Sequence, residues 1–222
     1  TADGYGLPAS VEYIYSRGGL HTASNGMEGK KLHVTFDKST KYDSNKNRTV
    51  NYRLNIPEGF TVEFWLKKDS FDTSKTNKEV ILDLWNGELS SSSDYGRFTL
   101  ALSGTTSGED TFVLSLQSGS NGFYEQAIGT STITTSSLGN WHFYSLSFVS
   151  ADSSVTSRLY VDGALNESKS LGSTSLNEIP GLINGYIGAL QTAPSGSSAV
   201  QFAGKLSASL DDFRFWKTRR TS

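Results

Sequence analysis

The stretch Phe60–Lys67, with the sequence FTVEFWLK, alternates large apolar residues with other types at a period of two. Successive side chains of a β-strand point to opposite faces, so this stretch would have one apolar and one mixed face. The apolar face would consist of Phe60, Val62, Phe64 and Leu66. Trp65 falls in the other phase and would point outward. Such a strand is typical of a sheet that covers a core with one side.

The same alternation recurs along the chain, and no window keeps apolar residues at the 3.6-residue period of a helix. Clusters of Gly, Ser, Asn and Asp separate the alternating segments. We see no internal repeat and no composition break that would mark a linker. The pattern therefore predicts an all-β, two-sheet antiparallel sandwich that occupies residues 1–222 as a single domain. Further strands are expected at Leu32–Phe36, Glu79–Trp85, Arg97–Leu102, Thr111–Gln117, Gly122–Ile128, His142–Phe148, Ser157–Val161, Gly185–Ile187 and Gln201–Ala208, with a last one at Leu210–Trp216.

One hairpin is specified by its turn. The segments Arg158–Val161 and Ala164–Asn166 flank the dipeptide Asp162-Gly163. Asp-Gly between alternating segments favours a two-residue turn with positive φ at both positions. The preceding strand ends in the loop Ser150–Thr156, so three consecutive antiparallel strands are expected here.

Composition excludes several classes of protein. The 222 residues are 36% hydrophobic and 12% aromatic, which suffices for one sizeable core rich in rings. A net charge of −2 offers no positive field for nucleic acid, and the short apolar runs predict no membrane insertion. The absence of cysteine excludes disulfides and thiol chemistry. Because the chain starts without Met and stops just after a strand, we expect a domain from a longer polypeptide.

Five segments in order carry a family resemblance. They are FTVEFWLKK at Phe60–Lys68, WHFYSLSF at Trp141–Phe148, SRLYVDGALNES at Ser157–Ser168, GYIGAL at Gly185–Leu190 and GKLSASLDDFRFW at Gly204–Trp216. Together they resemble the laminin-G-like branch of the concanavalin A-like lectin/glucanase superfamily, over residues 30–216. The resemblance implies a jelly roll of two antiparallel sheets, which agrees with the alternation.

The resemblance also implies a function. We expect a non-catalytic recognition module that binds a glycan or a cell-surface protein, within a larger extracellular or virion protein. Its other partners would be further domains of that polypeptide. The ending FWKTRRTS, Phe215–Ser222, is similar to laminin-G-like domains in virion proteins of tailed bacteriophages. The alternative is a purely structural virion or surface domain without a small ligand.

A glycosidase is the third alternative, because the superfamily includes such enzymes. Their retaining chemistry needs two carboxyl groups about 5–5.5 Å apart. The enzymes place these groups on one strand as Glu-x-Asp-x-x-Glu, whereas Glu79 and Asp83 here are four residues apart and expected on one face. Glu88 follows Asn86-Gly87 and would lie in a turn. His21, His33 and His142 show no metal-ligand spacing, so the pattern argues against catalysis.

Aromatic side chains are the expected sugar-binding groups. Trp65 would point outward, and Trp85, Tyr95 and Tyr124 would lie in or near loops. Ser- and Gly-rich loops would give Tyr95 and Tyr124 little neighbouring core, so these two are the strongest candidates. The alternative for all four residues is an ordinary role in the core or in covering a sheet edge.

The last strand, LDDFRFW at Leu210–Trp216, opens with two aspartates. Leu206, Ala208 and Leu210 share one alternation phase, whereas Asp211, Phe213 and Phe215 share the other. The inward-pointing positions therefore shift by one residue between Leu210 and Asp211, which predicts a β-bulge. The resemblance implies one structural Ca²⁺ with Asp211 as a ligand, joined by backbone carbonyls and water, for example around Asn25-Gly26. The alternative is that Asp211 accepts backbone N–H bonds at the bulge. Asp212 is expected to face solvent.

Overall fold

The computed structural model describes residues 20–21, 54–69, 78–103, 111–129, 138–179, 183–191 and 204–220. The strand expected at Leu32–Phe36, the proposed calcium donors Asn25-Gly26, and His21 as a side chain lie outside this part. The strand expected at Gln201–Ala208 is wrong where it can be compared. Residues 204–208 are not a strand, and the last strand begins at Ser209.

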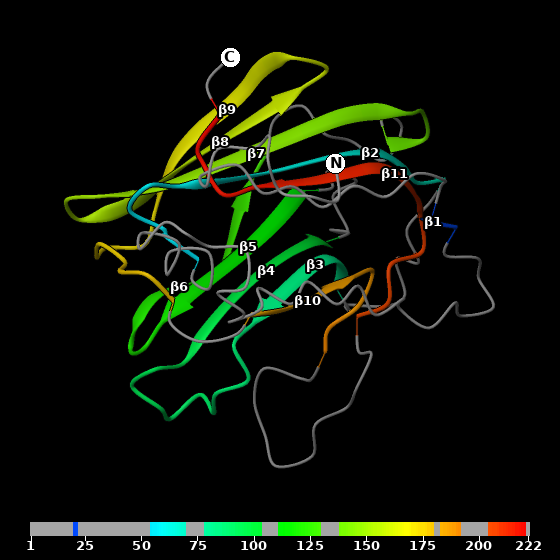
Figure 1. Ribbon diagram of the computed structural model, residues 1–222. Helices are drawn as coiled ribbons and strands as arrows, with labels where there is room; N and C mark the ends of the chain where they lie inside the picture. The colour runs from blue at the N-terminus through cyan, green and yellow to red at the C-terminus, as the bar shows by residue number, and fades with distance from the viewer. Residues whose placement is uncertain are drawn as a thin grey trace, which may run out of the picture.

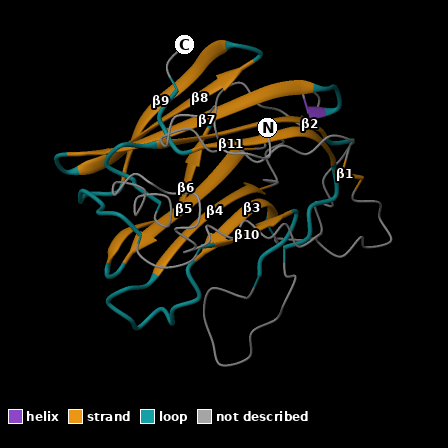
Figure 2. Ribbon diagram, in the orientation of Figure 1, coloured by secondary structure: helices purple, strands orange, loops and turns teal. Residues whose placement is uncertain are grey.

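Two antiparallel sheets form the molecule and lie one above the other (Figure 1). This arrangement confirms the predicted two-sheet jelly-roll sandwich, and Figure 2 shows that strands and their connecting loops, with one short helical segment at Leu138, make up the described chain. The six-stranded sheet has the order β1 (Leu20–His21), β11 (Ser209–Trp216), β2 (Phe60–Lys67), β7 (His142–Ala151), β8 (Ser154–Val161) and β9 (Ala164–Leu171). The five-stranded sheet has the order β10 (Asn184–Ile187), β3 (Glu79–Trp85), β4 (Gly96–Ser103), β5 (Thr111–Ser118) and β6 (Asn121–Ile128).

The core lies between the sheets and is rich in phenylalanine. Phe60, Val62, Phe64 and Leu66 of β2 are all 0% exposed, as the alternation predicted. The ring of Phe60 stacks on Phe148 and Phe215 of its own sheet, with centroids 4.7 and 5.6 Å away. It also meets Phe98 of the other sheet edge-on at 5.0 Å. Burial of each such side chain stabilises the fold by about 1.5–3 kcal/mol, so these rings hold the two sheets together.

The Asp162-Gly163 turn joins β8 and β9 as predicted. Asp162 has φ 50° and Gly163 has φ 83°, which are the positive values of the expected two-residue turn. The Asp162 carboxylate accepts the backbone N–H of Phe143 at 2.9 Å and contacts His142 Nδ1 at 2.6 Å. His142 therefore holds the turn against β7.

These contacts make the turn sensitive to acid. Slight burial raises the pKa of Asp162, but the bonds from His142 and Phe143 outweigh it and hold the pKa below its ordinary value. A depressed pKa adds stability above the unfolded value of about 3.9 and loses it as pH falls through the folded pKa. We expect wild type to exceed Asp162→Asn in urea-unfolding free energy at pH 6, and this advantage to be lost as pH falls through the lowered pKa of Asp162. An advantage that persisted at pH 2 would contradict the assignment.

The last strand contains the predicted bulge, one residue later than expected. Asp211 pairs with Trp65, and the next pair is Arg214 with Glu63, so the register shifts between Asp211 and Arg214. Asp212 takes the left-handed φ of 48° that accommodates the extra residue. Asp211 therefore shares the outer face with Trp65, and its expected inward phase with Phe213 is wrong.

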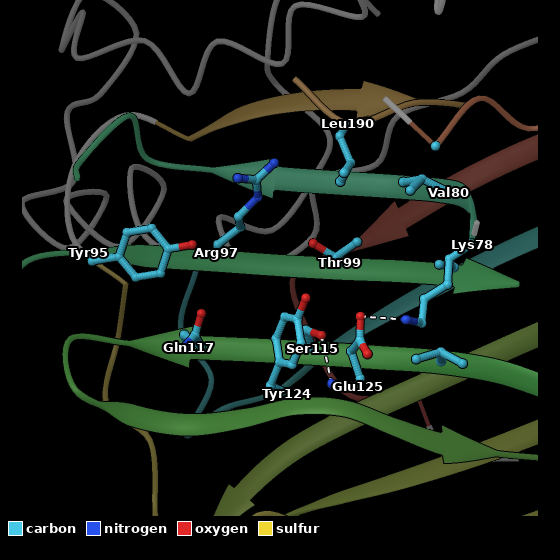
Figure 3. A pocket seen from close by; sticks show the side chains of 13 residues that line it. Lys78, Val80, Tyr95, Arg97, Thr99, Ser115, Gln117, Tyr124, Glu125 and Leu190 are labelled. Carbon is cyan, nitrogen blue, oxygen red and sulfur yellow. Dashed lines mark hydrogen bonds and ion pairs between the residues drawn. The ribbon is translucent and has the colours of Figure 1, made fainter. Parts of the chain in front are cut away.

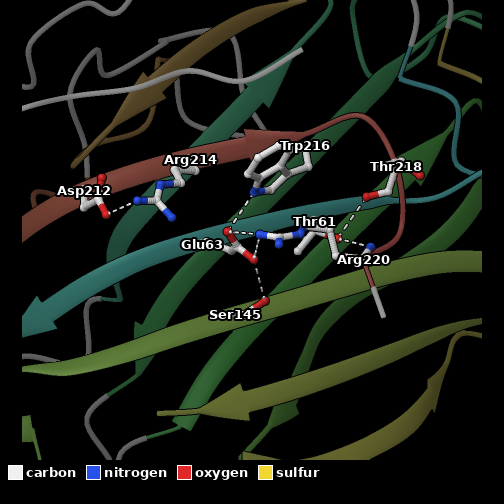
Figure 4. A network of polar contacts seen from close by, with 8 residues as sticks. All are labelled: Thr61, Glu63, Ser145, Asp212, Arg214, Trp216, Thr218 and Arg220. Carbon is white, nitrogen blue, oxygen red and sulfur yellow. Dashed lines mark hydrogen bonds and ion pairs between the residues drawn. The ribbon is translucent and has the colours of Figure 1, made fainter. Parts of the chain in front are cut away.

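The residues after β11 fold back over the outer face of the six-stranded sheet (Figure 4). Arg220 Nη1 lies 2.9 Å from both carboxylate oxygens of Glu63, and Trp216 Nε1 donates to Glu63 Oε2 at 2.7 Å. The Arg220 guanidinium lies over the Trp216 ring at 4.5 Å. Thr61 Oγ1 donates to Thr218 O at 3.0 Å and accepts Arg220 N–H at 2.9 Å. These bonds pair a glutamate that is 4% exposed, so this end of the chain is part of the fold.

Candidate functional site

A pocket of about 410 Å³ lies on the outer face of the five-stranded sheet (Figure 3). Figure 3 shows Tyr95, Arg97 and Gln117 toward one end of it and Lys78 and Val80 toward the other. The lining comes from β3, β4, β5 and β6 and from the segments next to them. It comprises Lys78, Val80, Tyr95, Arg97, Thr99, Ala101, Val113, Ser115, Gln117, Tyr124, Glu125, Leu190 and Gly204.

Strand alternation selects the residues that line the pocket. On β4, Phe98, Leu100 and Leu102 belong to the core, while the intervening Arg97, Thr99 and Ala101 line the pocket. On β5, Phe112, Leu114 and Leu116 are in the core, and Val113, Ser115 and Gln117 line the pocket. Paired residues of neighbouring strands lie on the same face, so these outward positions form rows across the sheet.

A β-bulge in β6 brings two adjacent side chains to the same pocket. Leu116 pairs with Phe123 and Leu114 with Gln126, so Ser115 alone is opposite both Tyr124 and Glu125. Glu125 has a left-handed φ of 50°, and its backbone N–H donates to Ser115 Oγ at 2.9 Å. Without the bulge these neighbours would point to opposite faces.

A buried ion pair supports the floor of the pocket. Arg97 Nε and Nη2 donate to the two oxygens of Asp83 at 2.7 Å each. Asp83 also accepts Thr99 Oγ1 at 3.2 Å and the backbone N–H of Gln191 at 3.0 Å. Burial acts to lower the pKa of Arg97, but the Asp83 carboxylate outweighs it and the pKa is raised. The pair holds the Arg97 side chain in a fixed position.

The two pocket tyrosines are neutral phenols at neutral pH. Burial raises the pKa of Tyr95, although the neighbouring Arg97 guanidinium acts to lower it. Burial and the adjacent Glu125 carboxylate raise the pKa of Tyr124. Each hydroxyl can therefore donate as well as accept a hydrogen bond.

The structure brings together three of the four aromatic residues predicted to bind a ligand. Tyr95 and Tyr124 both line the pocket, and Trp85 lies beside it with the Arg97 guanidinium 5.4 Å from its ring centroid. Trp65 is outward, as expected, at 37% exposed. It belongs to the other sheet, however, where its ring packs 5.6 Å from that of Phe143.

One detail of the predicted surroundings is wrong. Tyr124 lies within strand β6, near the turn that precedes it, as expected, and is 57% exposed. Tyr95 lies in the loop before β4 as expected, but it is only 3% exposed and so has many neighbours. It forms a wall of the pocket, while Tyr124 lies at its open side.

The carboxylates considered for catalysis lie apart. A bulge between Val80 and Leu82 puts Glu79 on the core-side phase of β3 and Asp83 on the outer face, so the expected shared face is wrong. Glu79 accepts Lys68 Nζ at 2.9 Å and the backbone N–H of Ser207 at 2.7 Å. Asp83 is 0% exposed and already holds Arg97. Glu88 lies in the loop after β3, as expected.

Asp211 accepts a backbone N–H bond at the bulge, which is the contact expected under the alternative to calcium binding. Its Oδ1 accepts the backbone N–H of Asp212 at 2.8 Å, within the bulge. Asp212 is half-buried and pairs with Arg214, so the prediction that it faces solvent is wrong. Across the described residues no three His, Cys, Asp or Glu side chains cluster as a metal site. Calcium binding by Asp211 stays a prediction.

Several pocket residues were not predicted from the sequence. Besides the tyrosines, the polar lining consists of Lys78, Arg97, Thr99, Ser115, Gln117 and Glu125. Of these, Arg97, Thr99, Ser115 and Gln117 could have been indicated only by their phase opposite the apolar residues of β4 and β5. The bulge that turns Glu125 outward has no glycine to mark it.

No helix among the described residues has the length and hydropathy to cross a membrane.

Three solved structures illustrate what this chain is similar to. Mouse laminin α1 chain domains LG4-5 are 12% identical, with a TM-score of 0.49 over 74% of this chain and 37% of that one. This chain thus spans about a third of that laminin structure. A pentraxin from Limulus polyphemus is 16% identical, with a TM-score of 0.46 over 76% and 68% of the two chains. An alginate lyase in complex with an alginate trisaccharide is 14% identical, with a TM-score of 0.42 over 73% and 71%.

No curated protein sequence matches significantly. TM-scores below 0.5 carry no functional conclusion. The family model described as the concanavalin A-like lectin/glucanases superfamily, of laminin-G type, matches residues 37–222. With that match over most of its length, the chain belongs to the concanavalin A-like lectin/glucanases superfamily as a laminin-G-type domain.

Proposed function

We propose that this domain is a non-catalytic recognition module that binds a glycan in the pocket on the five-stranded sheet. The observation that carries the proposal is the meeting of Tyr95 and Tyr124 with polar side chains in one open site. Concave sites with aromatic walls and a few placed polar groups are the usual form of small-ligand sites. Sugars match this combination, because they present apolar C–H faces as well as hydroxyl groups.

Each part of the pocket has a task in this proposal. Tyr124, exposed at the open side, offers a ring face for stacking, and Tyr95 closes one end. Thr99, Ser115 and Gln117 supply hydroxyl and amide groups for the hydroxyls of the ligand. Glu125 pairs with Lys78, and Asp83 pairs with Arg97. The pocket therefore does not offer the two carboxyl groups that a glycosidase needs on either side of the scissile bond.

We place this module in an extracellular or virion-surface protein, where a glycan-bearing cell surface and further domains of the polypeptide would be its partners. The family match supports this placement at the level of the superfamily. A bacteriophage origin rests on the resemblance of Phe215–Ser222. The genes that neighbour the coding sequence would test that origin.

A glycan array followed by titration of the best-bound glycan tests the proposed function. We expect Tyr124→Ala to weaken binding at least about five-fold, because truncation of an aromatic side chain that stacks on the ligand costs more than about 1 kcal/mol. Trp65→Ala is the matched control, since Trp65 is an exposed aromatic on the opposite sheet. It should leave the affinity unchanged.

The two variants separate the alternatives. Loss of binding in Trp65→Ala with full binding in Tyr124→Ala would move the site to the six-stranded sheet. An array without any bound glycan would contradict the proposal and favour the purely structural domain. Thermal unfolding of both variants checks that each remains folded.

We also propose that Asp211 contributes to a structural Ca²⁺ site. Because a ligand that binds only the folded state stabilises it, millimolar CaCl₂ should raise the Tm by a few degrees relative to EDTA. This rise should be lost in Asp211→Asn and kept in Asp152→Asn, which changes an exposed aspartate in the β7–β8 turn. No rise in the wild-type protein would rule out the site.

A further inference from the structure

The charged groups of the pocket compensate one another. Arg97 is held by both oxygens of Asp83, and Lys78 forms an ion pair with Glu125. Two positive and two negative side chains therefore leave the site formally neutral. An anionic ligand would have to displace Asp83 or Glu125 from its partner, or sit beside a carboxylate at a cost in repulsion.

One end of the pocket is lined by small aliphatic side chains. Val80 pairs with Ala101, and Ala101 pairs with Val113, so the three form one row across β3, β4 and β5. They are 3%, 3% and 7% exposed and line the pocket without offering a hydrogen-bond donor or acceptor from their side chains. A sugar hydroxyl buried against these three side chains would lose its water without gaining a partner from them, and Lys78 at the same end is already paired with Glu125. An apolar group suits this end.

The polar side chains of β4 and β5 that line the pocket begin two residues further along these strands. Thr99 and Ser115 form the next row, and Arg97 and Gln117 the row after it, toward Tyr95. A ligand that fills the pocket must therefore be amphipathic over the width of a few side chains. It needs hydroxyls or an amide in the middle and a compact apolar tip at the Val80–Ala101–Val113 row.

We propose that the pocket selects a neutral sugar unit with a methyl-bearing substituent, whose methyl group lies against Val80, Ala101 and Val113. This inference rests on the proposed glycan-binding function and specifies its ligand class. An acetamido group and the C6 methyl of a 6-deoxy sugar share this chemistry. Both present a methyl group on an otherwise hydroxylated neutral ring.

Sugar pairs that differ in the methyl group or in charge test the proposal by NMR titration of the domain. N-acetylglucosamine against glucose tests the acetamido source, and L-fucose against L-galactose tests the 6-deoxy source. Burial of one methyl group predicts about four-fold tighter binding for the preferred methyl-bearing sugar. Glucuronate should bind more weakly than glucose.

Two test variants, each with a matched control, locate the effect. Val113→Thr keeps the shape of the row but adds a hydroxyl, so the four-fold advantage should fall to about one. Val149→Thr, the same change on β7 of the other sheet, should preserve it. Glu125→Gln leaves Lys78 without its carboxylate and should raise glucuronate binding about five-fold. Glu58→Gln, an exposed site elsewhere, should not.

Each outcome has one meaning. Equal binding of both members of the two methyl pairs, or a preference for glucuronate, would overturn the proposed ligand class and leave glycan binding intact. A methyl advantage that survives Val113→Thr would also overturn it. Absence of binding to every sugar and to a glycan array would contradict the proposed function itself.

Discussion

Arg97→Met should lower the free energy of unfolding by about 3–5 kcal/mol. The change removes the guanidinium that donates two hydrogen bonds to Asp83 and leaves that carboxylate with Thr99 and the backbone N–H of Gln191. The Asp83 side chain is 0% exposed, so water cannot replace the lost partner. Because a buried charge without its counter-ion is costly, the loss should exceed that of an ordinary surface substitution. Urea denaturation at pH 7 measures it.

Arg214→Met is the matched control for this experiment. Arg214 pairs with Asp212 at the bulge of β11, where the side chains are 33% and 24% exposed. A partly solvated pair contributes only about 0–1 kcal/mol, so this variant should lose little stability. The double variant Arg97→Met with Asp83→Leu should recover much of the loss, because it removes both charges. Equal losses in the two arginine variants would contradict a special role for the buried pair.

Lys68→Met should be the second strongly destabilising change, at about 3 kcal/mol. Lys68 follows β2 of one sheet, and its Nζ lies 2.9 Å from both oxygens of Glu79, the first residue of β3 in the other sheet. The same ammonium donates to the carbonyl of Ser207 at 2.8 Å, just before β11. The side chain is 1% exposed, so the interaction joins the two sheets away from water.

Lys205→Met tests whether position matters more than residue type. Lys205 is exposed, so the same chemical change there should alter the unfolding free energy by less than about 0.5 kcal/mol. Adding Glu79→Gln to Lys68→Met removes the unpaired carboxylate and should restore part of the lost stability. If Lys68→Met unfolded at the same urea concentration as Lys205→Met, the bridge between the sheets would carry no net stabilisation.

The fold itself could be predicted from the sequence to a large extent. The period-two alternation of Phe60–Lys67 indicated which four side chains enter the core, and all four are buried. Asp162-Gly163 indicated a tight hairpin, because few dipeptides accept positive φ at both positions. These features are local, and each depends on the geometry of a few consecutive residues.

The pocket could be predicted only in part. Tyr95 and Tyr124 were singled out as binding candidates, yet their meeting depends on the pairing of β4, β5 and β6. Trp65 was a further outward-pointing candidate in the sequence, but its strand belongs to the other sheet. Alternation shows that a side chain points outward and does not show which sheet it points from.

The class of fold, the core phase of the main strands, the tight β8–β9 turn and the presence of a bulge in β11 follow from local sequence patterns. The bulges in β3 and β6 and the partners of the buried charges depend on contacts between segments distant in the sequence. The bulges at Ile81 and at Tyr124–Glu125 put Glu79 and Asp83 on opposite faces and Tyr124 and Glu125 on the same one. The physical reason is that a single extra residue reverses the phase of a strand, and whether it is accommodated depends on the neighbouring strand.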